Sequence, residues 1–364
     1  RVGVGIRSGA VRTDSAPPRR TPLILLTAAL LALAGCNAST PPSASGSASS
    51  SAGPSGSASS ASNVSDYVTP RTMPEGKGSG AADGVFPRTV RHFQGATTLE
   101  SAPKRIAVLS PGQADGLLTL GVIPAASTLT EGTDVIPAYL YTAYPQLKDG
   151  LDAVVRVGTP AAPSVEALAN LKPDLILVDN TVTDPEKLYR NLSLVAPTVF
   201  TQGSGPHWKQ DFLLAADALG KTTAASDWLD SYQSEAQAFG RSVTDKPEIS
   251  LVYKAADRIQ LFGAASPAGS VVEDLGLPRP VSQRFTNSVS IDLTAEQLAQ
   301  ADAGWIFYAV QGGDEAELTG LTQWPALAAV KAQRAVEVDG ATFFVNTGPT
   351  AAQQVLEKFQ TTLD

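Results

Sequence analysis

The sequence predicts an α/β protein whose ordered part forms two lobes joined by one long helix. Apolar runs typical of buried strands alternate with helical patterns over residues 85–201, and this alternation starts again near residue 247. Residues 224–243 place apolar side chains at helical spacing over a length of roughly 30 Å. We expect a first lobe at 85–222, an interlobe helix at 223–244, a second lobe at 245–364, and a ligand cleft between the lobes.

The first lobe opens with a predicted hairpin over residues 88–100 that turns near Gln94 and Gly95. Ser164 is suited to cap the helix that follows it, and Pro173 ends that helix. The rhythm of the remaining elements favours a mainly parallel sheet. The pattern predicts strands at 105–110, 122–127, 174–179 and 198–201, and helices at 111–120, 164–171, 185–194 and 208–219.

The second lobe begins with two strands, 249–254 and 258–262, that are predicted to pair. Thr294 and Gln297 form a T-x-x-Q capping box, which opens a further helix. The pattern also predicts helices at 270–275, 324–331 and 349–363, and strands at 305–310 and 335–338.

Residues 1–35 are predicted to be a lipoprotein signal peptide. Arg19 and Arg20 precede a charge-free run, 22–33, that is shorter than the roughly 20 residues of a membrane-spanning helix. Leu33-Ala34-Gly35-Cys36 resembles a bacterial lipobox, which implies cleavage before Cys36 and lipid on its sulfur. The protein would then lie on the outer face of the cell membrane, held by that anchor alone. The alternative is an ordinary secretory signal followed by an incidental cysteine.

Residues 36–84 are rich in Ser, Ala, Gly and Pro, and they are predicted to form a flexible tether because they offer little to bury. The whole chain has a formal charge of −8. Removing residues 1–35 takes away five basic side chains and one acidic one, so the formal charge becomes −12. This balance argues against nucleic acid as a partner and against electrostatic adhesion to anionic lipid.

The residues that could ligate a transition metal are few. The chain has two histidines, His92 and His207, and its single cysteine is expected to be lipidated. We therefore expect no direct metal ligand and no resident cofactor. His92 is expected at the surface, and His207 is either a ligand contact or a solvated helix-end residue. Neither histidine has a recognisable serine partner motif, so an enzyme is not expected; a surface hydrolase is the alternative.

Several segments resemble one family in matching order. These are Phe86–Val90 with Pro103–Leu109, Ser164–Leu168 with Leu171–Ile176, and Gly348–Ala352. Over residues 86–364 the chain resembles the substrate-binding proteins of ABC transporters for ferric siderophores, haem and cobalamin. Residues 277–285 are similar to actinobacterial iron-uptake lipoproteins in particular. The resemblance implies the class III periplasmic-binding-protein fold, in which two Rossmann-like lobes are joined by one long helix.

The same resemblance implies a monomer that captures a ferric siderophore, hydroxamate-like, and delivers it to an ABC-transporter permease. Haem or cobalamin binding, or a surface lipoprotein without a transport role, are the alternatives. In this family one glutamate on each lobe pairs with permease arginines, and Glu166 and Glu273 match those positions. The alternative for each is a solvated acid near a helix end.

A ferric siderophore already wraps its iron in oxygens, so its receptor needs cations and aromatic faces rather than metal ligands. Arginine suits this task because its guanidinium is planar and weakly hydrated. Asn180 follows a predicted strand, at the sheet edge where α/β proteins bind ligands. Surface salt bridges and core packing are the alternative roles for these side chains. The candidate ligand contacts are Arg284, Arg258, Arg156, Asn180, Trp208 and Tyr308.

Overall fold

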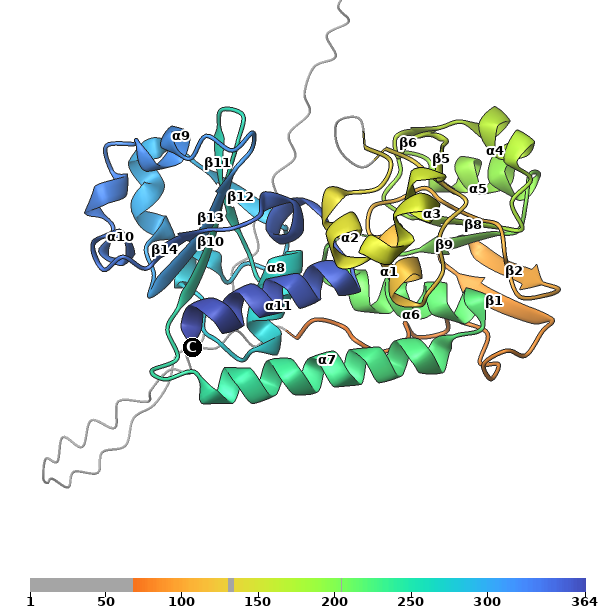
Figure 1. Cartoon of the computed structure of the whole chain (residues 1–364), viewed down its shortest axis with the longest axis horizontal. Coiled ribbons are helices and arrows are strands. Elements are labelled where there is room, and N and C mark those ends of the chain that lie inside the picture. Colours follow the sequence, from red (N-terminus) through yellow and green to blue (C-terminus); the bar gives the residue numbers. More distant parts are fainter. Residues whose placement is uncertain (1–67, 130–133, 204) are drawn as a thin grey trace, which may run out of the picture. The chain divides into compact units, whose positions relative to one another are not determined.

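A computed structural model describes residues 68–129, 134–203 and 205–364. These residues form two α/β lobes, as the sequence predicts (Figure 1), and each lobe is built on a five-stranded sheet. Arg19, Arg20 and Cys36 lie outside the described residues. Among the described residues, no helix combines the length and apolarity needed to cross a membrane.

The first lobe contains a parallel sheet in the order β5-β4-β3-β8-β9. Alternate residues of β8 face opposite layers, because successive strand side chains point to opposite faces. Ile176 packs with Leu168 and Leu192 of the outer helices, whereas Leu177 belongs to the larger core cluster. The strands are β3 (Ile106–Val108), β4 (Ala126–Ser127), β5 (Val155–Arg156), β8 (Leu175–Asp179) and β9 (Thr198–Thr201). The helices are α1 (Gln113–Thr119), α2 (Ala138–Ala143), α3 (Lys148–Asp152), α4 (Val165–Leu171), α5 (Pro185–Ser193) and α6 (Trp208–Leu219).

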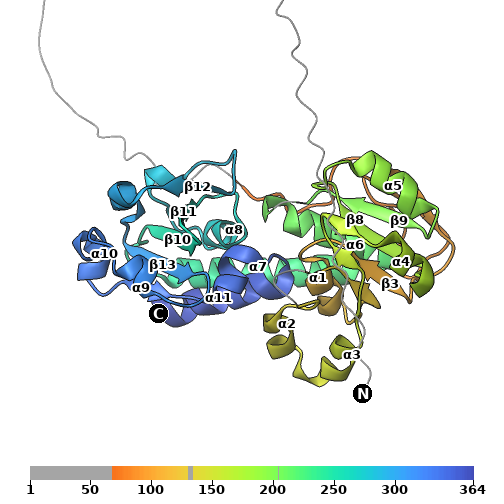
Figure 2. The ribbon, with the colours of Figure 1, turned by 90° about the horizontal axis from the view of Figure 1, so that it is seen from above.

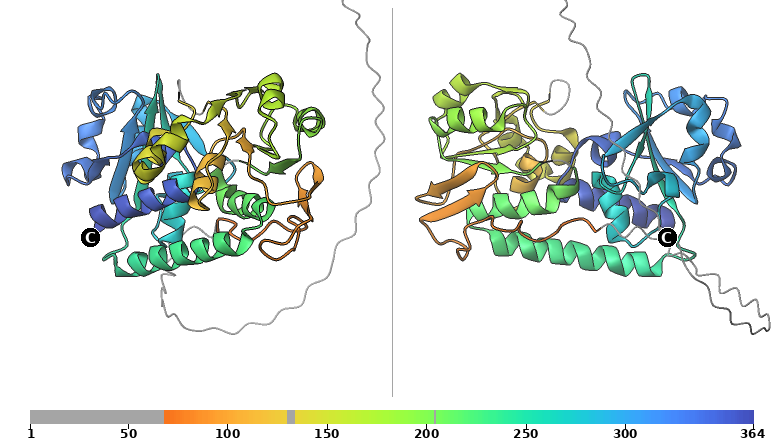
Figure 3. Two further views of the ribbon diagram at one scale, coloured as in Figure 1. Left: turned by 45° about the vertical axis from the view of Figure 1, so that its right-hand side comes forward. Right: turned by 180° about the vertical axis from the view of Figure 1, so that it is seen from behind.

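The second lobe contains a mixed sheet in the order β12-β11-β10-β13-β14. Tyr308 and Ile306 of β13 pack with the outer helices, and Phe307 packs in the larger cluster with α11. Helices therefore lie on both faces of this sheet (Figures 1 and 3). The strands are β10 (Ile249–Ala255), β11 (Arg258–Phe262), β12 (Ser290–Leu293), β13 (Trp305–Val310) and β14 (Ala335–Glu337). The helical segments are α8 (Pro267–Asp274), η4 (Ala295–Ala301), α9 (Ala316–Thr319), η5 (Trp324–Ala326), α10 (Ala328–Lys331), η6 (Ala341–Val345) and α11 (Pro349–Leu363).

The long helix α7 (Thr222–Ser242) joins the lobes, as predicted. It contacts α6 of the first lobe and both α8 and α11 of the second (Figures 1 and 2). One hydrophobic cluster runs through this junction, because it includes Phe212 of α6, Leu229 of α7 and Phe359 of α11. The two lobes therefore share a continuous core.

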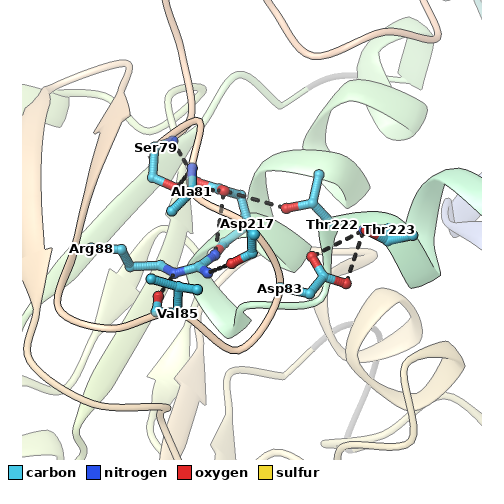
Figure 4. Close-up of polar contacts among 9 residues, drawn as sticks. Ser79, Ala81, Asp83, Val85, Arg88, Asp217, Thr222 and Thr223 are labelled. Carbon is cyan, nitrogen blue, oxygen red and sulfur yellow. Dashed lines mark hydrogen bonds and ion pairs between the residues drawn. The ribbon is translucent and has the colours of Figure 1, made fainter.

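The segment before the first hairpin packs on α6, although the composition of residues 36–84 predicted a loose tether. The hairpin consists of β1 (Arg88–His92) and β2 (Gly95–Leu99). Ser79 donates from its backbone and its hydroxyl to Asp217, both at 2.7 Å, and the buried guanidinium of Arg88 lies 3.4 Å from the same carboxylate (Figure 4). Asp83 accepts a hydrogen bond from the backbone of Thr223 (Figure 4). These polar contacts hold the segment against α6 and α7, and Met73 and Phe86 add apolar packing against the core.

His92 is buried, so the expectation of a surface histidine is wrong. Its ring lies against Tyr189 and Phe200 and hydrogen-bonds to Thr97. Burial, together with the nearby charge of Lys77, lowers the pKa of His92 to about 4. The residue therefore belongs to the packing between the hairpin and β9.

Candidate functional site

A cavity of ≈ 280 Å³ lies where the two lobes meet. Its first-lobe wall comes from the carboxyl ends of β8 and β9, the loop before α1, and α6, and its second-lobe wall comes from the starts of α8 and α11 and the end of η6. The carboxyl ends of parallel strands form the usual binding edge of an open α/β sheet. The lining residues include Asp179, Trp208, Asp211, Phe212, Val289, Phe344 and Val345.

Two glycines allow the lobes to approach closely at this cavity. A Cβ on Gly112 would lie 2.7 Å from the Thr347 side chain, and one on Gly348 would lie 2.7 Å from the Asp115 carboxyl carbon. Both glycines also have positive φ angles, 82° and 131°, which side-chain-bearing residues rarely adopt. A larger residue at either position would push the two walls apart.

Asp179 and Asp211 place two carboxylates at the cavity. Asp179 Oδ1 accepts the backbone N–H of Thr181 at 2.9 Å and also its hydroxyl. Asp211 accepts the N–H groups of Gln202 and Gly203, each at 2.8 Å. Burial, with a smaller contribution from the charge of Asp179, raises the pKa of Asp211 to about 7, although the N–H groups of Gln202 and Gly203 oppose the shift.

The rest of the cavity wall is largely apolar and aromatic. Trp208 is buried, and its indole N–H donates to the Ser270 hydroxyl at 3.0 Å, which fixes the ring across the lobe junction. Phe212 continues this wall on α6, and Val289 and Phe344 line it from the second lobe. An apolar cavity with a few polar groups is typical of small-molecule sites.

Behind the cavity, Asp115 of α1 bonds to the start of α11. Its carboxylate accepts the backbone N–H groups of Thr350 at 2.8 Å and Ala351 at 3.0 Å, as well as the hydroxyl of Tyr139 at 2.8 Å. Gly348, at the N-cap position of α11, has no side chain that could satisfy these donors. A side chain from the first lobe therefore caps a helix of the second lobe.

A buried ion pair makes a second connection between the lobes. Lys209 Nζ of α6 lies 2.6 and 2.7 Å from the two carboxylate oxygens of Asp274 in α8. Tyr232 of α7 donates its hydroxyl to the same carboxylate at 3.0 Å. Three helices thus meet at one charge pair, and both of its side chains are almost fully buried.

Of the six candidate ligand contacts, the cavity lining includes Trp208 but not the other five. Arg284 donates to the Arg279 carbonyl and lies 3.6 Å from Glu248. Arg258 forms an exposed ion pair with Asp292 at 3.6 Å. These two arginines therefore form ion pairs within the protein, which is the alternative role that the sequence analysis gave for them.

The remaining candidates occupy three different places. Arg156 is exposed on β5, at the edge of the first sheet. Asn180 follows β8, and its carbonyl oxygen accepts a hydrogen bond from the Gln94 side chain. Tyr308 is buried in β13, where it donates to Glu315 at 3.0 Å and packs against Trp324. His207 contacts Gln202 and Gln210 and is not among the cavity-lining residues.

The cavity residues that sequence reasoning missed differ in how easily they could be found. Asp179 is the last residue of a predicted strand, so the strand-end rule that selected Asn180 applies equally to its neighbour. Asp211 and Phe344 lie in helical segments, where no pattern separates a cavity residue from a core residue. Whether Asp211 and Phe344 line the cavity depends on how the two lobes pack.

The two predicted docking acids have different surroundings. Glu166 is exposed in the first turn of α4, next to the Ser164 cap that was predicted and is present. Glu273 is half-buried, and its carboxylate accepts the backbone N–H of Thr69 at 3.2 Å. Burial, with the nearby charge of Asp274, raises the pKa of Glu273. Glu273 is therefore partly covered by the segment that precedes the hairpin.

An internal repeat identifies another acid. Residues 164–178 and 294–308 align without gaps, with identical residues at Glu166 and Glu296, Leu168 and Leu298, and Ile176 and Ile306. In each copy a hydroxyl residue precedes a helical segment that leads into an interior strand of the sheet, and the Thr294 capping box is present as predicted. Glu296 is exposed like Glu166. Sequence comparison of the two lobes could have found it.

Among the described residues, no group of three or more His, Cys, Asp or Glu side chains is arranged to hold a metal ion. The cavity lining offers the carboxylates of Asp179 and Asp211 and the aromatic faces of Trp208, Phe212 and Phe344.

A family model described as periplasmic binding protein matches residues 106–340. "Probable siderophore-binding lipoprotein YfiY" of Bacillus subtilis is 30% identical, over 75% of this chain and 87% of the relative. "Fe(3+) dicitrate-binding periplasmic protein FecB" of Escherichia coli is 27% identical, over 74% of this chain and 88% of the relative. The crystal structure of Staphylococcus aureus SirA with staphyloferrin B has a TM-score of 0.66 and 26% identity, covering 76% of this chain and 98% of that one.

Proposed function

This chain belongs to the periplasmic binding protein family, and from that membership we propose that it captures a ferric siderophore outside the cytoplasm and delivers it to an ABC importer. Its relatives are named as solute-binding proteins rather than enzymes. Their names refer to siderophores or ferric citrate, which supports a ferric chelate as the ligand here.

The observation that carries this proposal is the cavity shared by the two lobes. It lies at the carboxyl ends of β8 and β9, and residues of the second lobe complete its wall. A ligand seated there would contact both lobes at once. Burial between two lobes favours selectivity through shape, because both surfaces must fit the same ligand.

A fluorescence titration tests the proposal directly. Trp208 lines the cavity, so a ferric chelate bound there should quench its emission. We expect saturable quenching of the purified chain by at least one ferric siderophore from a panel that also contains haem and cobalamin. A Trp208→Phe variant should lose much of that quenching, whereas Trp305→Phe, outside the cavity lining, should keep it. No saturable signal with any ferric siderophore would refute the proposal.

We propose further that lipid on Cys36 anchors the protein to the membrane. The support is the lipobox-like sequence at residues 33–36 and the lipoprotein names of two Bacillus subtilis relatives. Mass spectrometry of the mature protein should find diacylglyceryl on its first residue. A Cys36→Ala variant should release the protein from the membrane fraction.

For the permease we propose Glu166 and Glu296 as the docking pair, in place of Glu166 and Glu273. Both acids are exposed, each stands two residues after a helix cap, and each precedes an interior strand of its lobe's sheet. Hydrogen bonds from its own backbone N–H and from the Thr294 hydroxyl lower the pKa of Glu296, which keeps its carboxylate ionised. Equivalent positions on two lobes suit a partner with two equivalent cationic sites.

Haem and cobalamin have less support as ligands. Haem iron commonly takes an axial His or Tyr. His207 contacts Gln202 and Gln210, and the hydroxyl of Tyr308 donates to Glu315. Neither side chain lines the cavity.

A further inference from the structure

The charge of the cavity is unusual for a receptor of an anionic chelate. Its described lining residues include Asp179 and Asp211 but no Lys, Arg or His. A neighbouring hollow of ≈ 330 Å³, which shares Val345, is lined by Glu337 and Asp339, again without a basic side chain among the described residues. A polyanionic ligand would meet repulsion here that no basic side chain among the described lining residues offsets.

Asp179 has an unused acceptor at the cavity. The residue is 7% exposed, and both of its side-chain hydrogen bonds from Thr181 end on Oδ1. Among the described residues, no hydrogen bond reaches Oδ2. Oδ2 is not among the buried side-chain atoms that lack a partner, so it is accessible from the cavity, and a cationic donor from a ligand would be stabilised there by a charge-assisted hydrogen bond.

The size and surface of the cavity indicate which part of a ligand would enter it. Its volume of ≈ 280 Å³ is below the roughly 300–1,000 Å³ of ordinary small-ligand sites, so it suits part of a chelate rather than the whole. Trp208, Phe212 and Phe344 make much of the wall apolar. An aliphatic arm matches these rings, and a terminal ammonium matches the two carboxylates.

We propose that the cavity recognises a ferric chelate through an aliphatic arm ending in a cation, which pairs with Asp179 and Asp211. This inference rests on the proposed function and sharpens its substrate class to chelates without net negative charge. The oxygens around the iron would stay at the mouth of the cavity, where the protein need not supply a metal ligand. Selectivity against anionic chelates follows from the same two acids.

Three probes separate charge from iron chelation. Ferrioxamine B holds ferric iron in hydroxamates and has a free alkylammonium arm, its N-acetyl derivative differs by loss of that charge, and ferric dicitrate is anionic. We expect the purified chain to bind ferrioxamine B at least ten-fold more tightly than the acetylated form, because one partner of a buried charge pair is removed. Ferric dicitrate should bind most weakly.

The Asp179→Asn variant tests the residue. Asparagine keeps an oxygen for the Thr181 donors and replaces the unpartnered Oδ2 with an uncharged amide. Ferrioxamine B binding should fall at least ten-fold while binding of the acetylated form changes little, so the difference between the two ligands should largely disappear. The matched control, Asp292→Asn, removes an exposed acid that is not among the cavity-lining residues, and it should leave both affinities unchanged.

The outcomes separate the proposed recognition of a cationic arm from the proposed capture of a ferric siderophore. Equal affinity for ferrioxamine B and its acetylated form, or tighter binding of ferric dicitrate, would overturn the inference and leave the function standing. If Asp179→Asn bound neither ferrioxamine B nor its acetylated form and kept its melting temperature, Asp179 would be needed for binding the chelate as a whole. The proposed pairing of Asp179 with a cationic arm would then be wrong. Failure of all three chelates, with no other ferric siderophore bound, would reject the function and the inference together.

Discussion

Two pairs of acids lie at the junction of the lobes, and they differ in what their carboxylates bond. Asp115 and Asp274 accept hydrogen bonds from the opposite lobe or from the helix that joins the lobes. Asp179 and Asp211 accept hydrogen bonds only from nearby residues of their own lobe among those described. The first pair holds the two lobes together. The second pair is fixed in place without using the second lobe, which leaves it available to a ligand.

This difference indicates how the cavity keeps its form. The continuous hydrophobic cluster fixes the spacing of the lobes, together with the Lys209–Asp274 pair and the bonds from Asp115 to the start of α11. We therefore expect the cavity to be largely formed before a ligand binds, with little rearrangement of the backbone. Four substitutions or conditions test the comparison, and they follow in order of expected effect.

Lys209→Met should have the largest effect. It leaves Asp274 buried without its cation, so we expect the free energy of unfolding to fall by about 3–5 kcal/mol in a denaturant titration. Adding Asp274→Leu should recover part of this loss, because the buried charge is then removed as well. Lys148→Met, which breaks an exposed pair with Asp152, is the control and should have no measurable effect. Equal effects of the two single variants would contradict the structural role of the buried pair.

Asp115→Ala should have the next largest effect. It leaves the backbone donors at the start of α11 and the Tyr139 hydroxyl without an acceptor, at a cost of about 2–3 kcal/mol. Because this contact joins the lobes, amide hydrogen exchange should also rise at the start of α11. Asp227→Ala, an exposed acid on α7, should match the wild type. Unchanged exchange at α11 would show that the cap is not needed there.

The pH dependence of binding should report on the cavity acids. The pKa of Asp211 is about 7, and an ionised carboxylate binds a cation better than a protonated one. Affinity for ferrioxamine B should therefore rise as the pH rises, by about ten-fold from pH 6 to pH 8. The charged group that faces Asp211 is Asp179, and His207 contacts Gln202 next to it. Asp211→Asn should flatten the profile and His207→Gln should preserve it; a profile that persists in Asp211→Asn would assign the effect elsewhere.

The smallest effect in the purified protein should come from the docking acids. Glu166→Ala and Glu296→Ala should leave the free energy of unfolding and ligand affinity unchanged, because both side chains are exposed. In cells the double variant should lower uptake of the ferric siderophore several-fold. Glu273→Ala is the comparison, since it should release Thr69 without the same loss of uptake. Normal uptake in the double variant would remove these residues from the interface.

Much of the fold could be predicted because it depends on local patterns. Continuous apolar runs predicted β8 and β13, and an apolar face at helical spacing predicted α7. Each predicted end lies within two residues of the observed end. Strand 122–127 was predicted too long, since only β4 (Ala126–Ser127) pairs with its neighbours. Ser164 and Thr294 cap their helices because a hydroxyl residue next to free backbone N–H groups is a local chemical signal.

The cavity depended on contacts that no local pattern encodes. Lys209 and Asp274 lie 65 positions apart in the chain, and Asp115 and Thr350 lie 235 apart. An arginine that is predicted to contact the ligand can instead bond within the protein, as Arg284 does with the Arg279 carbonyl and the Glu248 carboxylate. The sequence by itself determined two α/β lobes, the long helix between them and the family. Only the tertiary structure decided which acids join the lobes and which face the ligand, because that choice depends on which donors from distant segments reach each carboxylate.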